Sequence, residues 1–184
     1  GHDFAEDGRP QNYYQDAPYP RDCHYCVINS RDYNALAACG LRHKGLHLLP
    51  NMITSYDLSH ARTLDRCFVL YPVRAIRRKN IGEAILHSLF FPNPFFLAIT
   101  LPPNSPRDWI IYNQWKQFAE HHNLPVLFEA SRSHAFPDLI QSAKAIISTS
   151  ISEGFGFSFL EPWTGGKMLH GRLIPDICQD FIKK

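Results

Sequence analysis

The sequence lacks long apolar runs, has no Asp-x-Asp motif and carries little net charge, and each absence narrows its possible functions. No apolar stretch approaches the roughly 18 residues that a membrane-spanning helix needs, and no signal-peptide pattern opens the chain. We therefore expect no transmembrane segment. The net charge of +2 gives no electrostatic argument for binding DNA or RNA, so we expect no nucleic-acid partner.

The sequence has few cysteines, and their number is odd. The chain has five cysteines, which argues against a disulfide framework and predicts a reducing, cytoplasmic compartment. Cys23 and Cys26 form a C-x-x-C pair, but a structural zinc site needs a second ligand pair at suitable spacing, and none is evident. A thioredoxin-like motif needs its own βαβ context. We interpret Cys23 and Cys26 as free thiols beside a strand.

What the chain does have is an ordinary globular composition. Its 184 residues are 45% hydrophobic and 20% charged, which suits one domain or two small ones. Residues 1–22 are polar and rich in proline and tyrosine, and this composition predicts a loop. Residues 51–65 have the character of a linker. We therefore place a domain boundary between residues 65 and 66.

Strands and helices are expected to alternate along most of the chain. A first strand at 24–28, a helix capped by Asn29 and ended by Gly40, and a strand at 46–49 precede the linker. Beyond it the expected strands are 67–71, 95–99, 126–128, 145–147 and 167–169, and the expected helices are 80–91, 108–122, 136–143, 157–163 and 175–182. Such alternation indicates an α/β fold, with a parallel sheet covered by helices on both faces.

The segment from Ala145 to Glu161 organises the chain. A short apolar strand leads into a loop of small residues and then into a helix, and the free N–H groups of such a helix start bind anions. Gly154 and Gly156 permit close approach of a ligand and positive φ angles. The carboxylates of Glu153 and Glu161 can accept hydrogen bonds from sugar hydroxyls. The segment therefore predicts a cradle for a nucleotide or a sugar phosphate.

Two motifs resemble a known enzyme family. Glu153 and Glu161 lie in the pattern Ser-Glu-Gly-Phe-Gly-x-x-x-Leu-Glu, which resembles the E-x7-E motif of retaining glycosyltransferases of the GT-B fold. The likeness is closest to the group that includes glycogen synthase and bacterial mannosyl- and glucosyltransferases. Upstream, Arg74 and Lys79 resemble the Arg-x4-Lys signature that follows the first strand of the family's C-terminal domain. One departure is Val73, where the family usually has glycine before the arginine.

The resemblance implies a partial chain with two domains. Residues 66–184 resemble the Rossmann-like domain that binds the nucleotide-sugar donor, incomplete at its C-terminus. Residues 1–65 resemble the tail of the N-terminal, acceptor-side domain and the linker that follows it. The implied protein is a bacterial enzyme that moves a sugar from a nucleotide-diphosphate donor to a sugar, lipid or small-metabolite acceptor, with retention of anomeric configuration.

The same resemblance implies a role for each motif residue. Arg74 and Lys79 grip the donor diphosphate and stabilise the charge that grows on the departing phosphate. Because no Asp-x-Asp motif is present, we expect no metal ion and no other cofactor. Glu153 approaches the transferred sugar, and Glu161 holds the ribose of the nucleotide. Gly154, Phe155 and Gly156 offer backbone N–H groups to the sugar and the phosphates.

Further assignments and alternatives stay open at this point. His2 resembles the histidine that lines the acceptor side of the cleft in relatives, and His134 follows a strand end where it borders the nucleobase. The basic residues at 77–79 also fit a solvated cluster at a helix start. Trp109, Tyr112 and Trp115 form a stripe that indicates core packing. The alternative functions are a non-catalytic nucleotide-sugar binding module and a sugar-nucleotide epimerase of the same fold.

Overall fold

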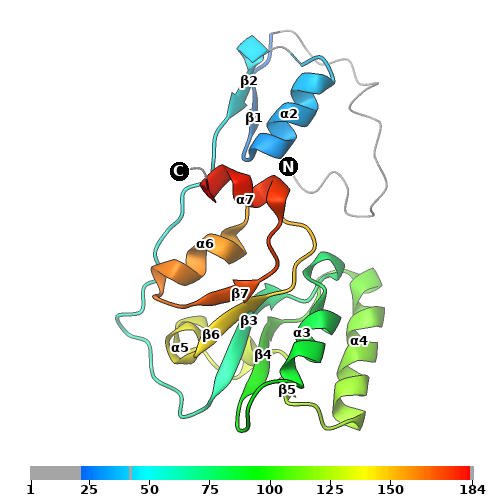
Figure 1. Ribbon diagram of the computed structural model, residues 1–184, viewed down its shortest axis with the longest axis vertical. Helices are drawn as coiled ribbons and strands as arrows, with labels where there is room; N and C mark the ends of the chain where they lie inside the picture. The colour runs from blue at the N-terminus through cyan, green and yellow to red at the C-terminus, as the bar shows by residue number, and fades with distance from the viewer. Residues whose placement is uncertain (1–21, 42, 183–184) are drawn as a thin grey trace. The chain divides into compact units, whose positions relative to one another are not determined.

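The chain forms two compact units in the computed structural model, which describes residues 22–41 and 43–182 (Figure 1). The larger unit contains residues 53–152 and 157–172. Within the described ranges, the smaller unit contains residues 22–52, 153–156 and 173–182. None of the helices in the described ranges is long and apolar enough to cross a membrane.

The larger unit is built on a five-stranded parallel sheet in the order β5-β4-β3-β6-β7. Its strands are β3 (Phe68–Arg74), β4 (Phe96–Leu101), β5 (Val126–Leu127), β6 (Ala145–Ser148) and β7 (Leu169–Gly171). Its helices are α3 (Ile81–Ser88), α4 (Pro106–His121), α5 (Phe136–Ser142) and α6 (Phe157–Thr164), with short 3₁₀ turns η2 (Arg77–Lys79) and η3 (Ala130–Arg132). This is the α/β architecture that the alternating pattern predicts.

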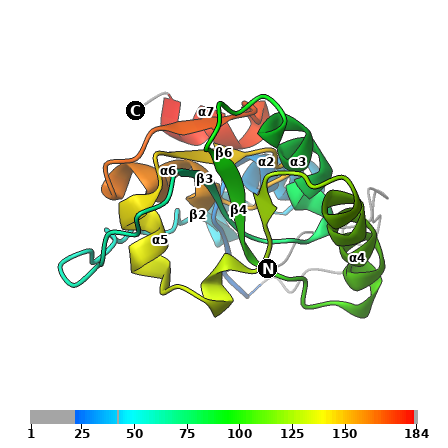
Figure 2. The ribbon, with the colours of Figure 1, turned by 90° about the horizontal axis from the view of Figure 1, so that it is seen from below.

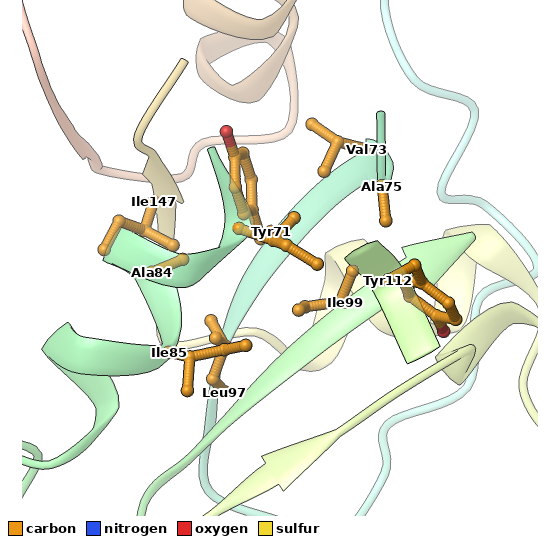
Figure 3. Close-up of a cluster of buried hydrophobic side chains, with 10 residues drawn as sticks. Tyr71, Val73, Ala75, Ala84, Ile85, Leu97, Ile99, Tyr112 and Ile147 are labelled. Carbon is orange, nitrogen blue, oxygen red and sulfur yellow. The ribbon is translucent and has the colours of Figure 1, made fainter. Parts of the chain in front are cut away.

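Helices cover both faces of this sheet because successive side chains of a buried strand point to opposite faces. Phe68 and Leu70 of β3 pack with the apolar side chains of α5. Tyr71 and Val73 point the other way and pack with α3 and α4 (Figure 3). Figures 1 and 2 accordingly show α3 and α4 on one side of the sheet and α5 and α6 on the other.

The predicted aromatic stripe of α4 belongs to this core. Tyr112 is fully buried, and Trp109 and Trp115 pack against the same cluster. Gly82 of α3 has no side chain for a reason: a Cβ atom there would lie 2.4 Å from the Trp115 ring. The two helices therefore approach each other closely at this point.

The smaller unit pairs β1 (Tyr25–Val27) in parallel with β2 (Leu46–Leu48) and adds α2 (Ser30–Ala38), the 3₁₀ turn η1 (His43–Gly45) and α7 (Pro175–Ile182). The cap predicted for α2 is present, since Asn29 Oδ1 accepts a hydrogen bond of 2.7 Å from the Asp32 N–H. Gly40 follows the helix with φ of +88°, as a glycine in that position predicts. Asp180 of α7 accepts a hydrogen bond of 2.8 Å from the Ser30 N–H at the start of α2. The positive end of the helix dipole stabilises a carboxylate at this position.

Several element boundaries differ from the sequence-based expectation. β3 continues to Arg74 and does not end at Tyr71, because Val73 is buried and its carbonyl accepts a 2.8 Å hydrogen bond from Thr100 Oγ1. Val73 therefore lies within a strand, and the turn falls at residues 77–80. The helix α4 begins at Pro106, since Ser105 caps it. β7 occupies 169–171, two residues later than expected.

The segment expected to be a linker has no helix or strand, but most of it belongs to the larger unit, which begins at Ile53. Tyr56, Leu58 and Leu64 pack against the cluster formed by α5 and the sheet. The Leu64 N–H donates to Ser142 Oγ at 2.8 Å. The assignment of residues 1–65 to an acceptor-side domain stays a prediction.

Candidate functional site

Arg74 and Lys79 lie at the carboxyl end of β3 and in the turn that follows it, on the side where ligands bind in parallel α/β sheets. Arg74 is the last residue of β3, and its exposed guanidinium donates through Nη1 to the Pro102 carbonyl at 3.0 Å. Lys79 is the last residue of the turn η2. β3 is the middle strand and pairs directly with β6, so the loops that follow these two strands are neighbours.

A buried tyrosine joins these two loops. The Tyr71 hydroxyl donates a 2.6 Å hydrogen bond to the Lys79 carbonyl and accepts one of 3.2 Å from the Thr149 N–H. In Figure 3 this hydroxyl points away from Leu97 and Ile85. Burial raises the pKa of Tyr71, so the hydroxyl stays protonated and remains a donor at neutral pH.

Further hydrogen bonds connect the loop after β3 with the loop after β6. Thr149 Oγ1 lies 3.1 Å from the Lys79 carbonyl and 2.9 Å from the Asn80 carbonyl and can donate to either. The Ile151 N–H donates to the Arg78 carbonyl at 2.9 Å, and Arg78 Nη1 donates to the Ser152 carbonyl at 3.2 Å. Asn80 adopts φ of +49°, a left-handed conformation that asparagine tolerates well. The backbone that carries Lys79 is therefore held in a defined position.

Glu161 lies in the helix α6, which follows the loop after β6. It is partly buried, and its Oε2 atom accepts a 3.2 Å hydrogen bond from the Tyr56 hydroxyl. Its own carbonyl accepts a 2.7 Å hydrogen bond from Thr164 Oγ1. The carboxylate is thus engaged on one oxygen by a residue of the segment that precedes the sheet.

The remaining predicted donor-binding residues, Glu153 to Gly156, belong to the smaller unit. Asn29 Nδ2 donates to the Gly154 carbonyl at 2.7 Å, and Arg31 Nη1 donates to the Glu153 carbonyl at 3.4 Å. Glu153 itself is buried. Among the glycines of the described chain, φ is positive at Gly40, Gly156 and Gly166. The freedom to adopt a positive φ is therefore used at Gly156.

The remaining candidates from the sequence are two histidines and the C-x-x-C pair. His2 lies outside the described residues. His134 follows the turn η3, and its N–H donates to the Ala130 carbonyl at 3.1 Å. Cys23 and Cys26 are exposed free cysteines. Across residues 22–41 and 43–182, no group of three or more His, Cys, Asp and Glu side chains is placed to hold a metal ion. The functional roles of the motif residues stay predictions.

The structure also adds residues that local sequence patterns do not indicate. Tyr56, Tyr71 and Thr149 position the loops and the glutamate of the larger unit, and Asn29 does so in the smaller one. The one available indication was the hydroxyl group of Tyr71 within an otherwise apolar strand, because a buried hydroxyl requires a partner. The partners of the others are distant in sequence.

The sequence is similar to that of a known synthase. A mannosylglucosyl-3-phosphoglycerate synthase from Petrotoga mobilis is 28% identical over 209 aligned residues, covering 98% of this chain. The chain spans only 41% of that relative's length. No known protein-family profile matches the chain.

Solved glycosyltransferase structures share the fold. A glycosyltransferase from Rickettsia africae matches 93% of the chain and 50% of its own length, with a TM-score of 0.69 at 14% identity. TarM, known from S. aureus, matches 88% of the chain and 32% of its own length, with a TM-score of 0.65 at 16% identity. HepE from Anabaena, solved with UDP-glucose, matches 80% and 44%, with a TM-score of 0.60 at 15% identity. The larger unit therefore has the Rossmann-like fold found in GT-B glycosyltransferases.

Proposed function

We propose that this chain forms the donor-binding part of a retaining glycosyltransferase that uses a nucleotide-diphosphate sugar. The observation that carries the proposal is that Arg74 ends β3 while hydrogen bonds between the loops after β3 and β6 fix the backbone of Lys79, so that both cations lie at the carboxyl end of the same strand. Positive side chains at this edge of a parallel sheet suit a diphosphate. Glycosyltransferases with the same fold, including one solved with UDP-glucose, support this assignment.

The proposed chemistry needs charge stabilisation more than a protein nucleophile. As the bond between the sugar and the diphosphate breaks, negative charge grows on the leaving phosphate. Arg74 and Lys79 contribute charge-assisted hydrogen bonds of about 1.5–3 kcal/mol each, and those that strengthen in the transition state accelerate the reaction. The departing phosphate takes the proton of the acceptor hydroxyl, which attacks the same face and so retains the configuration. These two cations replace the metal ion that Asp-x-Asp enzymes use.

Each glutamate has a separate role in the proposal. Glu161 accepts hydrogen bonds from the ribose hydroxyls, and Glu153 approaches the transferred sugar. The backbone N–H groups of residues 154–156 contact the sugar and the phosphates. The name of the Petrotoga mobilis relative describes a glycosylated phosphoglycerate, so we extend the proposal to a small sugar-containing acceptor.

The test is transfer by the full-length protein in the presence of EDTA. GDP-mannose, UDP-glucose and ADP-glucose are supplied one at a time with glucosyl-3-phosphoglycerate, and the anomeric configuration of any product is read by NMR. We expect one donor to give a product with the donor's own configuration. A product of inverted configuration, or turnover that requires a divalent cation, would contradict the proposal.

A further inference from the structure

Tyr56 contacts the helix that carries Glu161 at several points. Its hydroxyl donates to Glu161 Oε2 at 3.2 Å, and its N–H donates to Thr164 Oγ1, also at 3.2 Å. Its ring lies edge-on to Phe136, with the ring centroids 5.7 Å apart. A Cβ atom on Gly165 would lie only 3.2 Å from the ring. Tyr56 is therefore held against α6 through its side-chain hydroxyl and its backbone N–H.

We propose that Tyr56 is a positioning residue that holds the Glu161 carboxylate in the orientation that receives the ribose of the donor. This inference rests on the proposed function, because it assigns Tyr56 a task only if Glu161 contacts a nucleotide. It goes beyond the E-x7-E resemblance, in which residue 56 has no part.

The geometry explains how one contact leaves the glutamate able to bind. A carboxylate offers two oxygens with about four lone-pair sites. Tyr56 uses one site on Oε2, so Oε1 and a further site on Oε2 remain for a pair of hydroxyls. A glutamate side chain loses considerable rotamer freedom when it is ordered. If that freedom is already restricted before the nucleotide arrives, the affinity for the nucleotide rises.

The backbone of Glu161 is fixed by the same arrangement. Thr164 Oγ1 donates to the Glu161 carbonyl at 2.7 Å and accepts from the Tyr56 N–H at 3.2 Å. One threonine thus links the tyrosine to the turn of helix that bears the glutamate. Burial and the neighbouring Glu161 carboxylate both raise the pKa of Tyr56, so its hydroxyl remains protonated and donates throughout the physiological range.

The experiment measures binding of ribose hydroxyls directly. The full-length protein is titrated calorimetrically with UDP, GDP and ADP, and then with the 2′,3′-dideoxy form of the one that binds. Tyr56→Phe, Glu161→Ala and the double variant are compared with the wild type. Tyr112→Phe is the matched control, because the Tyr112 hydroxyl donates to Glu129 Oε1 at 3.1 Å and so forms an equivalent tyrosine–carboxylate pair away from Glu161.

We expect Tyr56→Phe to weaken binding of the ribonucleotide about three- to tenfold, the size of one hydrogen bond, and to leave binding of the dideoxy form unchanged. The substitution has no further effect when Glu161 is already alanine, and Tyr112→Phe changes neither affinity. Thr164→Val, which retains the Tyr56 hydroxyl but removes the shared threonine contact, weakens ribonucleotide binding in the same direction to a smaller extent.

Different failures are distinguishable. If none of the three diphosphates binds, the proposed function and this inference are both wrong. If Glu161→Ala leaves the preference for ribose intact, the role assigned to Glu161 is wrong. If Glu161→Ala removes that preference but Tyr56→Phe keeps it, only the inference about Tyr56 is overturned. Tighter ribonucleotide binding by Tyr56→Phe would also overturn it, because Tyr56 would then compete with the ribose for Glu161.

Discussion

Arg74 and Lys79 differ in how the fold presents them. Arg74 ends a buried strand and extends an exposed guanidinium from the edge of the sheet. Lys79 ends the turn η2, and its carbonyl lies within hydrogen-bonding distance of the Tyr71 and Thr149 hydroxyls. The two cations therefore come from different elements, the end of β3 and the turn that follows it. Their shared position at the carboxyl end of β3 is the basis for proposing a diphosphate ligand.

Replacing either cation should weaken nucleotide binding through the diphosphate. We expect Arg74→Ala and Lys79→Ala each to lose about 1.5–3 kcal/mol of binding free energy, a charge-assisted hydrogen bond each. Arg66→Ala is the control, because Arg66 is an exposed cation of the same unit that precedes the amino end of β3. Calorimetric titration with the nucleoside diphosphate that binds checks the result. Equal losses in all three variants would indicate general electrostatics and not a site.

At the scale of elements, hydrogen bonds connect the loops after β3 and β6. Tyr71 is fully buried and satisfies polar groups of both loops. Thr149 adds a second connection to the carbonyls of Lys79 and Asn80. Because these groups are buried, each lost partner leaves a polar atom that water does not reach. The loops and the central strands should therefore unfold as one unit.

Removal of the Tyr71 hydroxyl should lower the stability of the larger unit. We expect Tyr71→Phe to reduce the free energy of unfolding by about 1–3 kcal/mol, since the Lys79 carbonyl and the Thr149 N–H both lose a partner. In urea denaturation, Tyr71→Phe and Thr149→Val should show non-additive losses, because both act on the same loops. Additive losses, or a change for Tyr71→Phe below about 0.3 kcal/mol, would show that the loops are not coupled through this hydroxyl.

The contact between α3 and α4 gives a test of packing. Gly82→Ala places a Cβ atom against the Trp115 ring, and we expect a loss of about 1–3 kcal/mol in unfolding free energy from overpacking. In a Trp115→Leu background, where the ring is absent, the same Gly82→Ala substitution should cost less unfolding free energy than it does in the wild type. If Gly82→Ala instead raises the stability, as alanine does in an unhindered helix, the close approach is not present in solution.

Most elements of this fold could be predicted from local patterns, and the exceptions have physical causes. The helix α2 follows from its Asn29 cap, and the aromatic stripe of α4 follows from helical spacing. The end of β3 could not be placed, because a proline at position 72 suggests a turn while burial of Val73 favours continuation of the strand. Motif spacing located Arg74, Lys79 and the two glutamates, whose functional roles remain to be tested.

The residues that escaped prediction share one property. Tyr56 contacts Glu161 from 105 residues away, and Tyr71 contacts Thr149 from 78 residues away. No pattern within a window of the length of a helix or strand encodes such a contact. A tyrosine in a strand or loop is also ordinary, so neither residue stands out until the fold brings its partner close.

On the scale of the whole molecule, the chain divides its candidate residues between two compact units. The larger one carries Arg74, Lys79 and Glu161, and the smaller one carries residues 153–156. Three tyrosines of the larger unit, of which Tyr71 and Tyr112 are buried and Tyr56 is partly buried, should make its stability depend on pH in the alkaline range. Burial raises the pKa of Tyr71, Tyr56 and Tyr112 above the ordinary value of 10.0, and neighbouring glutamates add to the effect at Tyr56 and Tyr112.

The sign of this pH dependence follows from proton binding. A raised pKa means that the folded chain keeps the phenolic proton at a pH where the unfolded chain releases it. The contribution of these tyrosines is therefore fully present below pH 10.0 and is lost as the pH rises above it. Denaturation from neutral pH to alkaline pH should show falling stability, with a shallower slope for Tyr56→Phe and Tyr112→Phe. A slope unchanged in both variants would contradict the assignment.

The proposed function requires the carboxyl-terminal side of the sheet, at β3 and β6, to bind a nucleoside diphosphate without a metal ion. Calorimetric titration of the full-length protein with UDP, GDP and ADP in EDTA tests it most directly. We expect that one of the three binds, and that binding is weakened by Arg74→Ala but not by Arg66→Ala. Absence of binding by all three, or binding that appears only when a divalent cation is added, would contradict it.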